Sequence, residues 1–417
     1  MNSFEDLGVP QNLLNKLSAQ GIDEPTPIQC KAIPKALDGR DILGLAQTGT
    51  GKTAAFVLPL LAQVLKIGGK REEKSVQSLI LAPTRELAKQ IDTTIKAFVE
   101  GSHLRVRLVV GGVSISGQIK RLSKGSDILV ATPGRLIDLL ERNAVRLDDT
   151  KFLVLDEADQ MLDLGFIHSL RKIADLLPEN RQTMLFSATM PKKMSELASS
   201  YLSDPIRVEA APSGKVADKI TQSIHFVSKQ DRNKLLTDLL AHHKSELAIV
   251  FSRTKHGAEK LLKTIINSGC SAVSVHGNKS QAQRERALDA FRSGKNKVLV
   301  ATDVAARGLD IPLVKHVYNF DLPNVAENYV HRIGRTARAG SDGCAIAFCS
   351  SEEISELRAI QKILGTSIPV ASGKPWIDFD AEMRTRKNSK SRTKSRWNRK
   401  KFTGSSKKKN SFASPHK

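Results

Sequence analysis

The amino-acid sequence predicts an α/β fold of two tandem domains with parallel β-sheets, followed by a basic, disordered C-terminal tail. Three observations carry this prediction: short continuous apolar runs, helical segments between those runs, and a pause in the alternation near the middle of the chain. The chain has 417 residues, which fits two or three domains at about 150 residues each. A hydrophobic content of 40% and a charged content of 26% are typical of a globular protein.

Five apolar runs in the first half of the chain are predicted to form buried strands. Each run is continuous rather than alternating, as expected where helices cover both faces of a sheet. The runs span residues 41–45, 78–82, 127–130, 152–155 and 184–186. Helical segments lie between them, for example at 86–99 and 135–141. This alternation predicts parallel βαβ units.

The alternation pauses and restarts, which indicates a domain boundary. Asp204-Pro205 and Ala211-Pro212-Ser213-Gly214 mark the pause, and further apolar runs follow at 247–251, 297–300, 314–320 and 345–348. No short-period repeat is visible, although the two halves share a strand–helix rhythm. We therefore expect a first domain over residues 1–208, a linker over 209–219, a second domain over 220–372 and a tail over 373–417.

Positive charge is concentrated in the tail. The net charge of the chain is +22, and residues 381–417 contribute 14 Lys or Arg residues and one acidic residue, a net of +13. With few aliphatic residues, this segment cannot fold alone. It is either a solvated, solubilising tail or a tether that binds polyanions through phosphate contacts and counterion release. Trp397 and Phe402 could stack on bases, whereas the lack of amphipathic periodicity disfavours a membrane surface.

The sequence also argues against several classes of protein. It contains no run of about 18 apolar residues, as a transmembrane helix requires, and its start lacks the basic and apolar regions of a signal peptide. The four cysteines, Cys30, Cys270, Cys344 and Cys349, form no Cys-x-x-Cys pair. This argues against a zinc site or a disulfide framework and favours a reducing compartment, so we expect a cytoplasmic protein.

A phosphate-binding loop is predicted directly after the first apolar run. The segment matches G-x-x-x-x-G-K-T except at its first position, and reads Ala46, Gln47, Thr48, Gly49, Thr50, Gly51, Lys52 and Thr53. Glycines let the backbone N–H groups face phosphate oxygens, and the following helix adds its positive dipole end. Lys52 can reach the β- and γ-phosphates, and Thr53 can hold Mg²⁺. The alternative is a glycine-rich turn that binds nothing. Pro59 predicts a kink or an early end of the following helix.

Two carboxylates follow the apolar run at 152–155. Asp156 stands where a P-loop protein holds Mg²⁺, partly through water, and Glu157 is placed to orient or deprotonate an attacking water. An acidic cluster after a strand is otherwise most often a helix N-terminus favoured by the dipole. The neighbouring phosphate-binding loop makes the catalytic interpretation the stronger one.

Further short motifs follow one another in order along most of the chain. Besides Asp156-Glu157-Ala158-Asp159, they are Phe4, Pro25-Thr26-Pro27-Ile28-Gln29, Pro83-Thr84-Arg85-Glu86-Leu87-Ala88, Gly111-Gly112, Thr132-Pro133-Gly134-Arg135, Ser187-Ala188-Thr189, Ala301-Thr302-Asp303, Ala306-Arg307-Gly308-Leu309-Asp310 and His331-Arg332-Ile333-Gly334-Arg335-Thr336 with Arg338. From Phe4 to Gly340 the chain resembles a DEAD-box RNA helicase. Its short N-terminus and basic tail are similar to those of the bacterial RhlE-type subgroup.

The resemblance implies two RecA-like domains with an ATP site in the cleft between them. It implies that Gln29 reads the adenine edge through its amide, that Phe4 stacks on the adenine ring and that Asp310 meets the ribose. It also implies that Ser187 and Thr189 couple the phosphate site to RNA. Without the resemblance, Gln29 would be interpreted as an ordinary surface amide. The Ser-Ala-Thr segment would be interpreted as a capped strand end.

The resemblance further implies arginine fingers. Arg335 and Arg338 are spaced by three, so they share one face if this segment is helical. Beside the nucleotide site they would stabilise charge on the γ-phosphate, so that the catalytic set becomes Lys52, Glu157, Arg335 and Arg338. Without that site they would be a solvated basic helix face.

The predicted RNA surface consists of loops at the carboxyl ends of strands, where doubly wound sheets bind ligands. In the first domain the candidates are Pro83, Thr84, Arg85, Gly111, Gly112, Thr132, Pro133, Gly134 and Arg135, and in the second domain analogy adds Arg253, Gln281, Arg284 and Thr302. Thr84 and Thr132 are also predicted helix caps. Such contacts read phosphates and 2′-hydroxyls, so we expect little sequence preference in the core.

The second domain departs from the first and, in two places, from the family pattern. The segment after 247–251 is Ser252-Arg253-Thr254-Lys255, with no Gly-x-Gly-Lys-Thr, so we expect no nucleotide of its own. Asn278 stands where the family commonly has Asp, and Ala337 replaces a common Gly. The first change would weaken an interdomain contact, and the second would adjust local packing.

The predicted function is ATP-dependent unwinding or remodelling of RNA by a monomer that uses ATP and Mg²⁺. ATP would bridge the two domains, and RNA would span both, so each ligand would strengthen binding of the other. The partners would be single-stranded and duplex RNA, including ribosomal RNA precursors or mRNA decay complexes, with no membrane role. A DNA helicase and a non-catalytic RNA clamp are the alternatives. The spacing of the histidines gives no support for metal-centred catalysis.

Overall fold

The computed structural model describes residues 3–46, 49–67, 71–209, 220–306, 311, 314–337 and 342–376. The chain separates into two units, Met1–Gly373 and Lys374–Lys417, and nearly all described residues belong to the first. The predicted linker beyond Glu209 and the predicted tail beyond Trp376 lie outside the described residues.

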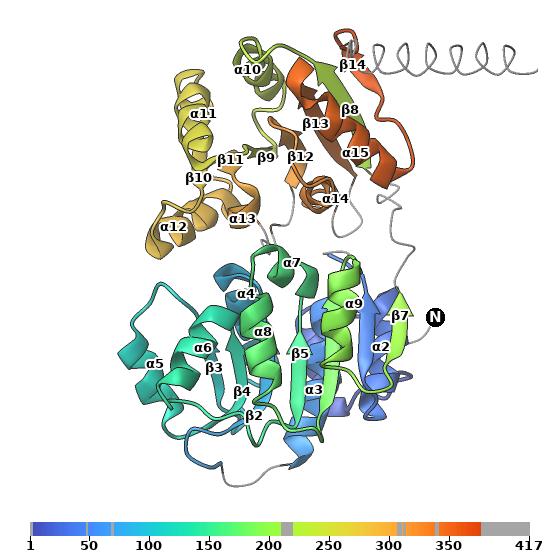
Figure 1. The fold of residues 1–417 in the computed structure, drawn as a ribbon, viewed down its shortest axis with the longest axis vertical. Coiled ribbons are helices and arrows are strands. Elements are labelled where there is room, and N and C mark those ends of the chain that lie inside the picture. The colour runs from blue at the N-terminus through green and yellow to red at the C-terminus, as the bar shows by residue number, and fades with distance from the viewer. Residues whose placement is uncertain are drawn as a thin grey trace, which may run out of the picture. The chain divides into compact units, whose positions relative to one another are not determined.

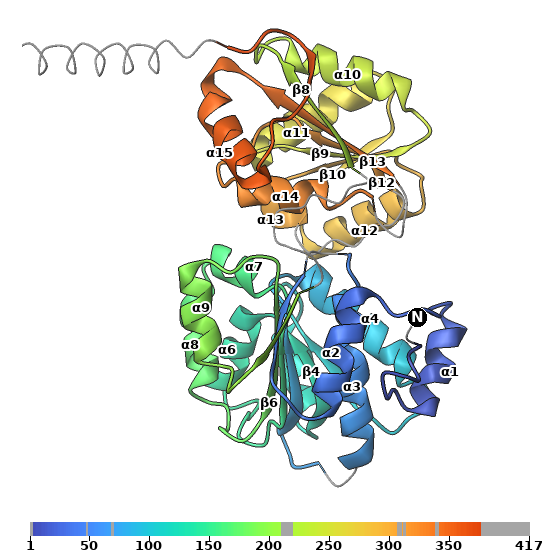
Figure 2. The ribbon, with the colours of Figure 1, turned by 90° about the vertical axis from the view of Figure 1, so that its right-hand side faces the viewer.

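The first half of the chain forms a parallel sheet with helices on both faces (Figures 1 and 2). Within the described residues this sheet has seven strands in the order β3-β4-β2-β5-β6-β1-β7. The strands are β1 (Ile42–Leu45), β2 (Val76–Leu81), β3 (Val106–Val109), β4 (Ser126–Ala131), β5 (Phe152–Leu155), β6 (Gln182–Ser187) and β7 (Ile206–Glu209). The helices are α1 (Gln11–Ala19), α2 (Pro27–Leu37), α3 (Lys52–Ile67), α4 (Arg85–Phe98), α5 (Ile115–Leu122), α6 (Pro133–Glu141), α7 (Ala158–Asp163), α8 (Ile167–Ala174) and α9 (Lys192–Ser199).

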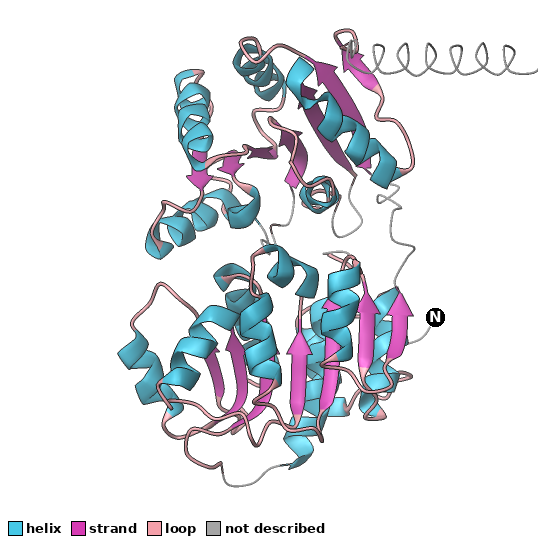
Figure 3. Ribbon diagram, viewed as in Figure 1, coloured by secondary structure: helices cyan, strands magenta, loops and turns pink. Residues whose placement is uncertain are grey.

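The second half forms another parallel sheet, also visible in the colouring by secondary structure (Figure 3). Its seven described strands lie in the order β10-β11-β9-β12-β13-β8-β14. They are β8 (Ile220–Phe226), β9 (Leu247–Phe251), β10 (Ala272–Val275), β11 (Val298–Ala301), β12 (Val314–Asn319), β13 (Gly343–Cys349) and β14 (Val370–Ser372). The helices are α10 (Arg232–His242), α11 (Lys255–Asn267), α12 (Gln281–Arg292), α13 (Asp303–Ala306), α14 (Glu327–Ile333), the 3-10 helix η1 (Ser351–Glu353) and α15 (Ile354–Leu364).

The two sheets share one topology. Numbered within its own domain, each sheet has the strand order 3-4-2-5-6-1-7, so β8 corresponds to β1 and β9 to β2. The counterpart of the phosphate-binding loop therefore follows β8, not β9, so the predicted counterpart, Ser252-Arg253-Thr254-Lys255, is at the wrong strand. The segment after β8, Val227-Ser228-Lys229-Gln230-Asp231, has no glycine, so the second domain still lacks a phosphate-binding loop.

Two apolar layers sandwich the first sheet, as the continuous runs predict. One face packs against α2, α3 and α4 through residues such as Ile33, Phe56 and Ile91, and the opposite face packs against α6, α8 and α9 through residues such as Leu136 and Leu170. Burial on both faces explains why these central strands contain no polar alternation.

Helix α3 continues through Pro59, so the predicted early end of this helix is wrong. It runs for 16 residues to Ile67, and Phe56, Val57, Leu58, Leu60 and Leu61 are all buried. Pro59 removes one backbone hydrogen bond, at a cost of about 3 kcal/mol. Each of the surrounding apolar side chains contributes about 1.5–3 kcal/mol by burial, which outweighs this cost.

Candidate functional site

The phosphate-binding segment joins β1 to α3, as predicted. Gly49 and Gly51 adopt φ values of 87° and 88°, which are accessible chiefly to glycine. A Cβ atom on Gly51 would lie 2.6 Å from Gln29 Nε2, so the close approach of the two segments also requires glycine. Ala46 is buried and donates its N–H to Ser187 O (3.0 Å), whereas Gln47 and Thr48 lie outside the described residues.

Lys52 and Asp156 lie close together at the carboxyl ends of the central strands. Lys52 is 6% exposed, and its Nζ has no hydrogen-bond partner within the described residues although it lies 3.9 Å from Asp156 Oδ1. Burial raises the pKa of Asp156 to about 6, opposed in part by the charge of Lys52. A buried ammonium without hydrogen bonds is energetically costly and is suited to an anionic ligand such as a phosphate.

Two oxygen ligands beside Lys52 fit Mg²⁺. Asp156 supplies a buried carboxylate, and Thr53, in the first turn of α3, supplies a hydroxyl. Hard cations of this kind prefer carboxylate and hydroxyl oxygens, with water completing the coordination. These residues would hold the ion against the phosphates of a nucleotide.

Glu157 and Asp159 differ in backbone conformation and in hydrogen bonding in the segment after β5. Glu157 is the N-cap residue of α7 and adopts a left-handed conformation with φ 52°, which is unusual for a side chain of this size and is typical of functional sites. Asp159 Oδ2 accepts hydrogen bonds from Ala188 N (3.1 Å), Thr189 N (2.9 Å) and Thr189 Oγ1 (2.9 Å). Asp159 thus ties the acidic segment to the segment after β6. The sequence alone assigns no role to Asp159, although Asp159 is the last residue of the acidic motif.

Gln29 links the start of α2 to the phosphate-binding segment. Its Oε1 accepts from Thr26 N (2.9 Å) and its Nε2 donates to Gly51 O (2.9 Å). An amide has two acceptor lone pairs and two donor hydrogens, so one of each remains for an adenine edge. Phe4 is 3% exposed and packs in the core of the first domain, so stacking on adenine requires it to leave this packing. Both adenine assignments stay predictions.

Ser187 and Thr189 are joined by a hydrogen bond, in which Ser187 Oγ donates to Thr189 O (2.7 Å). Together with Asp159 and Ala46 they make a continuous hydrogen-bonded path between the acidic segment and the phosphate-binding segment. The predicted coupling role of Ser187 and Thr189 stays a prediction, and this path is the geometry on which it depends.

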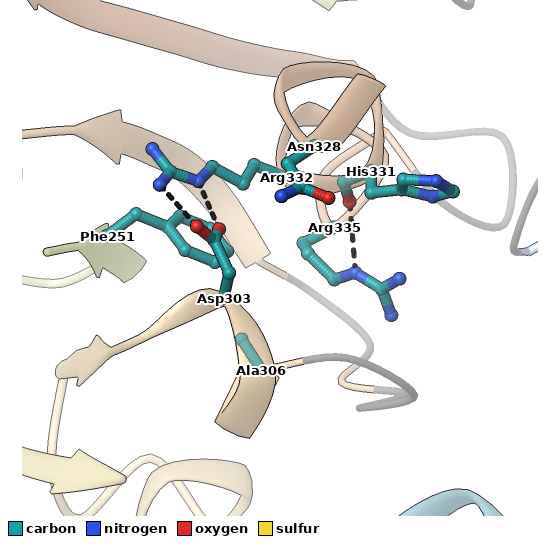
Figure 4. Close-up of a pocket in the computed structure, with 7 residues that line it drawn as sticks. All are labelled: Phe251, Asp303, Ala306, Asn328, His331, Arg332 and Arg335. Carbon is teal, nitrogen blue, oxygen red and sulfur yellow. Dashed lines mark hydrogen bonds and ion pairs between the residues drawn. The ribbon is translucent and has the colours of Figure 1, made fainter. Parts of the chain in front are cut away.

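The two described arginines of the second domain's arginine motif are not equivalent. Arg332 forms two hydrogen bonds with Asp303 (2.5 and 2.8 Å), donates to Asn319 Oδ1 (3.1 Å) and lies 4.9 Å from the centre of the Phe251 ring. Figure 4 shows Arg332 turned toward Asp303, while Arg335 lies apart from this pair and donates from Nε to His331 O (3.2 Å). Arg332 is therefore a structural residue, and Arg335 is the better candidate for a finger. Arg338 and Asp310 lie outside the described residues.

Ala337 adopts a conformation that disfavours any residue with a side chain. Its φ is 55°, in the left-handed region, where a Cβ atom costs roughly 1–2 kcal/mol. The neighbouring Thr336 is fixed because its Oγ1 donates to Val314 O (2.6 Å) and lies 3.0 Å from Lys315 O. The sequence predicts that Ala337 adjusts local packing. The structure shows instead that Ala337 adopts a strained backbone conformation next to the arginines.

We expect Ala337→Gly to raise the free energy of unfolding by about 1 kcal/mol, because glycine tolerates this conformation. Thermal or urea unfolding measures the effect. The control is Ala326→Gly at φ −65°, where glycine should instead destabilise by about 0.5–1 kcal/mol. Equal destabilisation by both substitutions would contradict the strain at Ala337.

The predicted RNA loops of the first domain lie at the carboxyl ends of β2, β3 and β4. Thr84 caps α4, accepting from Leu87 N (3.2 Å), as predicted. Arg85 packs so closely on the glycine pair that a Cβ atom on Gly112 would lie 2.1 Å from Arg85 Nη1. Arg135 donates to Val113 O (3.0 Å), which joins the last two loops. Thr132 occupies the N-cap position of α6, as predicted, although its side chain makes no capping hydrogen bond.

The predicted RNA-binding residues of the second domain lie in three segments that follow the carboxyl ends of strands. Arg253 follows β9 and Thr302 follows β11, while Gln281 and Arg284 occupy the first turn of α12, after β10. Gln281 and Arg284 are spaced by three residues and so share one helix face. The exposed Asn278 lies in the same segment as Gln281 and donates its N–H to His276 Nδ1 (3.3 Å).

A histidine–glutamate cluster in the second domain does not have the geometry of a metal site. One possible ligand atom from each of His243, Glu246 and His316 lies within 4.8 Å of the other two. However, the two imidazole rings stack with centroids 3.9 Å apart and an interplanar angle of 27°, so their lone pairs do not converge on one point. Glu246 instead accepts a hydrogen bond from His316 Nε2 (2.5 Å).

Comparison with protein families decides the assignment. The DEAD/DEAH box helicase model matches residues 26–197, and the helicase conserved C-terminal domain model matches residues 231–340. The chain belongs to the DEAD-box RNA helicases. This DEAD-box protein thus has the phosphate-binding segment in the first matched region and the arginine motif in the second.

Solved structures agree with this assignment along nearly the whole described chain. Dbp5 of S. cerevisiae bound to RNA and ADP BeF3 is 32% identical, with a TM-score of 0.79, covering 89% of this chain and 96% of its own. The DEAD-box helicase Mss116 bound to ssRNA and UDP-BeF is 28% identical, with a TM-score of 0.82, covering 90% and 81%. A DEAD box protein of Methanococcus jannaschii is 36% identical, with a TM-score of 0.51, covering 89% and 99%. Among the described residues of the DEAD-box protein, no helix has the length and apolarity needed to cross a bilayer.

Proposed function

We propose that ATP binding brings the two domains of this ATP-dependent RNA helicase together on single-stranded RNA, and that hydrolysis lets them separate. ATP and Mg²⁺ are its cofactors, and RNA is its substrate. The observation that carries the proposal is the buried Lys52 ammonium, which has no hydrogen-bond partner within the described residues and lies beside Asp156. The solved structures of Dbp5 and Mss116, bound to RNA and nucleotide analogues, support it.

Within this proposal each residue of the phosphate site has one task. Lys52 binds the β- and γ-phosphates, Thr53 and Asp156 hold Mg²⁺, and Glu157 orients the attacking water and accepts its proton. Arg335 and Arg338 of the second domain stabilise negative charge on the transferred phosphoryl group. When bound, Mg²⁺ would neutralise negative charge on the phosphates.

Domain closure would couple the two ligands. Because ATP contacts residues of both domains and RNA does so too, both ligands favour the closed state. Linkage then requires that each ligand strengthens binding of the other. Release of phosphate by the wild-type protein should rise with added RNA. RNA binding without any ATP turnover would identify a clamp instead, and preferential separation of DNA duplexes would identify a DNA helicase.

We expect oligouridine to bind at least about tenfold more tightly than the matching deoxyoligonucleotide, because 2′-hydroxyls supply hydrogen bonds that DNA lacks. Fluorescence anisotropy with an ATP analogue measures both affinities across a salt series. Affinity should fall with salt in proportion to the phosphates contacted, with a slope of about −0.7 per phosphate. Equal affinity for RNA and DNA would contradict the 2′-hydroxyl contacts.

The tail is proposed as a tether for RNA. We expect truncation after Ala381 to leave the maximal RNA-stimulated ATPase rate unchanged but to lower RNA affinity by about tenfold at low salt, because 14 basic residues are lost. A chain with a neutral Gly/Ser tail of equal length separates the effect of charge from that of length. RNA affinity that is unchanged by truncation would show that the tail is only solubilising.

We also propose that this DEAD-box protein acts as a cytoplasmic monomer of the RhlE-type subgroup. Ribosomal RNA precursors and mRNA decay complexes are the candidate partners, argued from the basic tail and the sequence-independent contacts of the core. Crosslinking in cells followed by sequencing of the attached RNA distinguishes these partners.

A further inference from the structure

Corresponding charged residues occupy the carboxyl ends of the central strands in both domains. Since the sheets share one strand order, β8 corresponds to β1 and β12 to β5. Helix α3 begins at Lys52 after β1, and α10 begins at Arg232 after β8. Asp156 follows β5, and Asp321 follows β12. Arg232 and Asp321 therefore stand in the second domain where Lys52 and Asp156 stand in the first.

The two pairs differ in what surrounds the cation. Lys52 Nζ lies 3.9 Å from Asp156 and has no hydrogen-bond partner among the described residues. Arg232 is 2% exposed and engaged at both terminal nitrogens: Nη1 donates to Asp321 Oδ1 (3.1 Å) and Phe320 O (2.9 Å), and Nη2 donates to Glu353. The second domain has thus closed its counterpart of the phosphate site with an internal ion cluster.

Glu353, in η1 after β13, is the hub of this cluster. It is 3% exposed and accepts hydrogen bonds from Arg232 Nη2, Arg253 Nη2 (3.0 Å), Ser350 N (3.1 Å), Ser350 Oγ (3.0 Å) and Leu322 N (3.2 Å). Burial opposes ionisation, but hydrogen bonding and charge from Arg232 outweigh it and hold the pKa of Glu353 below its usual value. The carboxylate is therefore a charged, fixed anchor.

Arg253 is the one RNA candidate that this cluster holds. Its backbone N–H donates to Asp321 Oδ2 (2.8 Å), and its Nη2 donates to Glu353 and to Leu322 O (2.9 Å). Its side chain is 36% exposed, whereas that of Glu353 is 4% exposed. A guanidinium has five N–H donors, so this anchoring on one edge leaves donors for a phosphate on another.

We propose that Arg232 and Glu353 are positioning residues that hold Arg253 ready for a backbone phosphate of RNA. The former phosphate site of the second domain thereby serves RNA instead of nucleotide. This inference rests on the proposed function, because it takes Arg253 as an RNA contact. A side chain held in its binding geometry loses less conformational entropy on binding, which strengthens the contact.

The isosteric substitution Glu353→Gln tests the inference through the sign of its effect. The cluster contains two arginines and two carboxylates, so removing one negative charge makes it net positive. If only charge mattered, RNA would bind more tightly. If Glu353 positions Arg253, affinity for oligouridine should fall about tenfold. The RNA concentration for half-maximal ATPase stimulation should rise equally, with the KM for ATP unchanged. Tighter or unchanged RNA binding would overturn the inference.

A double-substitution cycle separates positioning from a general loss of structure. In an Arg253→Ala background, Glu353→Gln should have no further effect on RNA affinity, whereas independent effects would overturn the inference. The matched control is Glu246→Gln, which removes a carboxylate from the histidine cluster next to the amino end of β9 and should leave RNA affinity unchanged. If Glu353→Gln does not fold, Ser350→Ala removes one hydrogen bond from Glu353 and should weaken RNA binding about threefold. Unchanged affinity in that variant would also overturn the inference.

Failure of the proposed function gives a different result. Wild-type protein without RNA-stimulated ATPase activity would remove the proposed function itself. If RNA stimulates the ATPase activity of the wild-type protein but Arg253→Ala binds RNA as tightly as the wild type, the proposed function stands. Only the role of Arg253, and with it this inference, would then be wrong.

Discussion

Arg335→Ala is expected to abolish ATP hydrolysis while leaving weak ATP binding. The guanidinium would act mainly on charge that develops in the transition state, and loss of such a finger costs about 10³-fold or more in turnover. Arg335 is 3% exposed and its Nε donates to His331 O, whereas Arg332 forms an ion pair with Asp303. Nucleotide binding and RNA-stimulated phosphate release measure the two halves of the prediction.

Two variants serve as controls for Arg335. Arg332→Ala leaves Asp303 without its partner and should destabilise the second domain by about 3–5 kcal/mol, seen in thermal unfolding rather than in turnover alone. Arg335→Lys keeps the charge but loses the planar fork, so it should recover little activity. Normal turnover in Arg335→Ala would be fatal to the finger assignment.

Glu157→Gln is expected to reduce hydrolysis by about 10²- to 10⁴-fold, because the amide cannot accept a proton from the attacking water. ATP and RNA should still bind, so the ternary complex should persist far longer than in the wild type. Single-turnover hydrolysis and RNA dissociation measured on the same preparation test both statements.

Asp156→Asn is the matched control for Glu157→Gln. It changes the adjacent carboxylate but removes a proposed Mg²⁺ ligand, so it should weaken Mg²⁺-dependent nucleotide binding itself. If Glu157→Gln also weakened nucleotide binding to a similar extent, Glu157 would be a ligand-holding residue rather than the base.

Most of the central strands were predictable from the sequence, and the four edge strands were not. β1, β5 and β9 are continuous apolar runs, because helices cover both faces of the sheet at these positions. The predicted apolar runs do not include β3, β7, β8, β10 and β14, and four of these five strands lie at sheet edges. β3 reads Val-Arg-Leu-Val and β7 reads Ile-Arg-Val-Glu, so polar side chains that face solvent interrupt the apolar run. Apolar continuity reports burial on two faces, which edge strands lack.

Local motifs located the candidate site, but pairwise contacts between distant segments could not be deduced from them. The phosphate-binding segment and Asp156 are adjacent to strands, so their meeting follows from parallel topology. The hydrogen bonds from Ala188 and Thr189 to Asp159, and the pairing of Arg332 with Asp303, depend on side-chain geometry across neighbouring loops. Spacing alone made Arg332 resemble Arg335. Both side chains are buried, and it is the ion pair with Asp303 that marks Arg332 as a structural arginine.

The shared strand order of the two sheets has a consequence for stoichiometry. A tandem copy of one ancestral unit would begin with two nucleotide pockets, yet only the segment at 46–53 retains the Gly-x-Gly-Lys-Thr signature. Each polypeptide should therefore consume a single ATP per cycle, and titration with a tight analogue should saturate at one equivalent per chain.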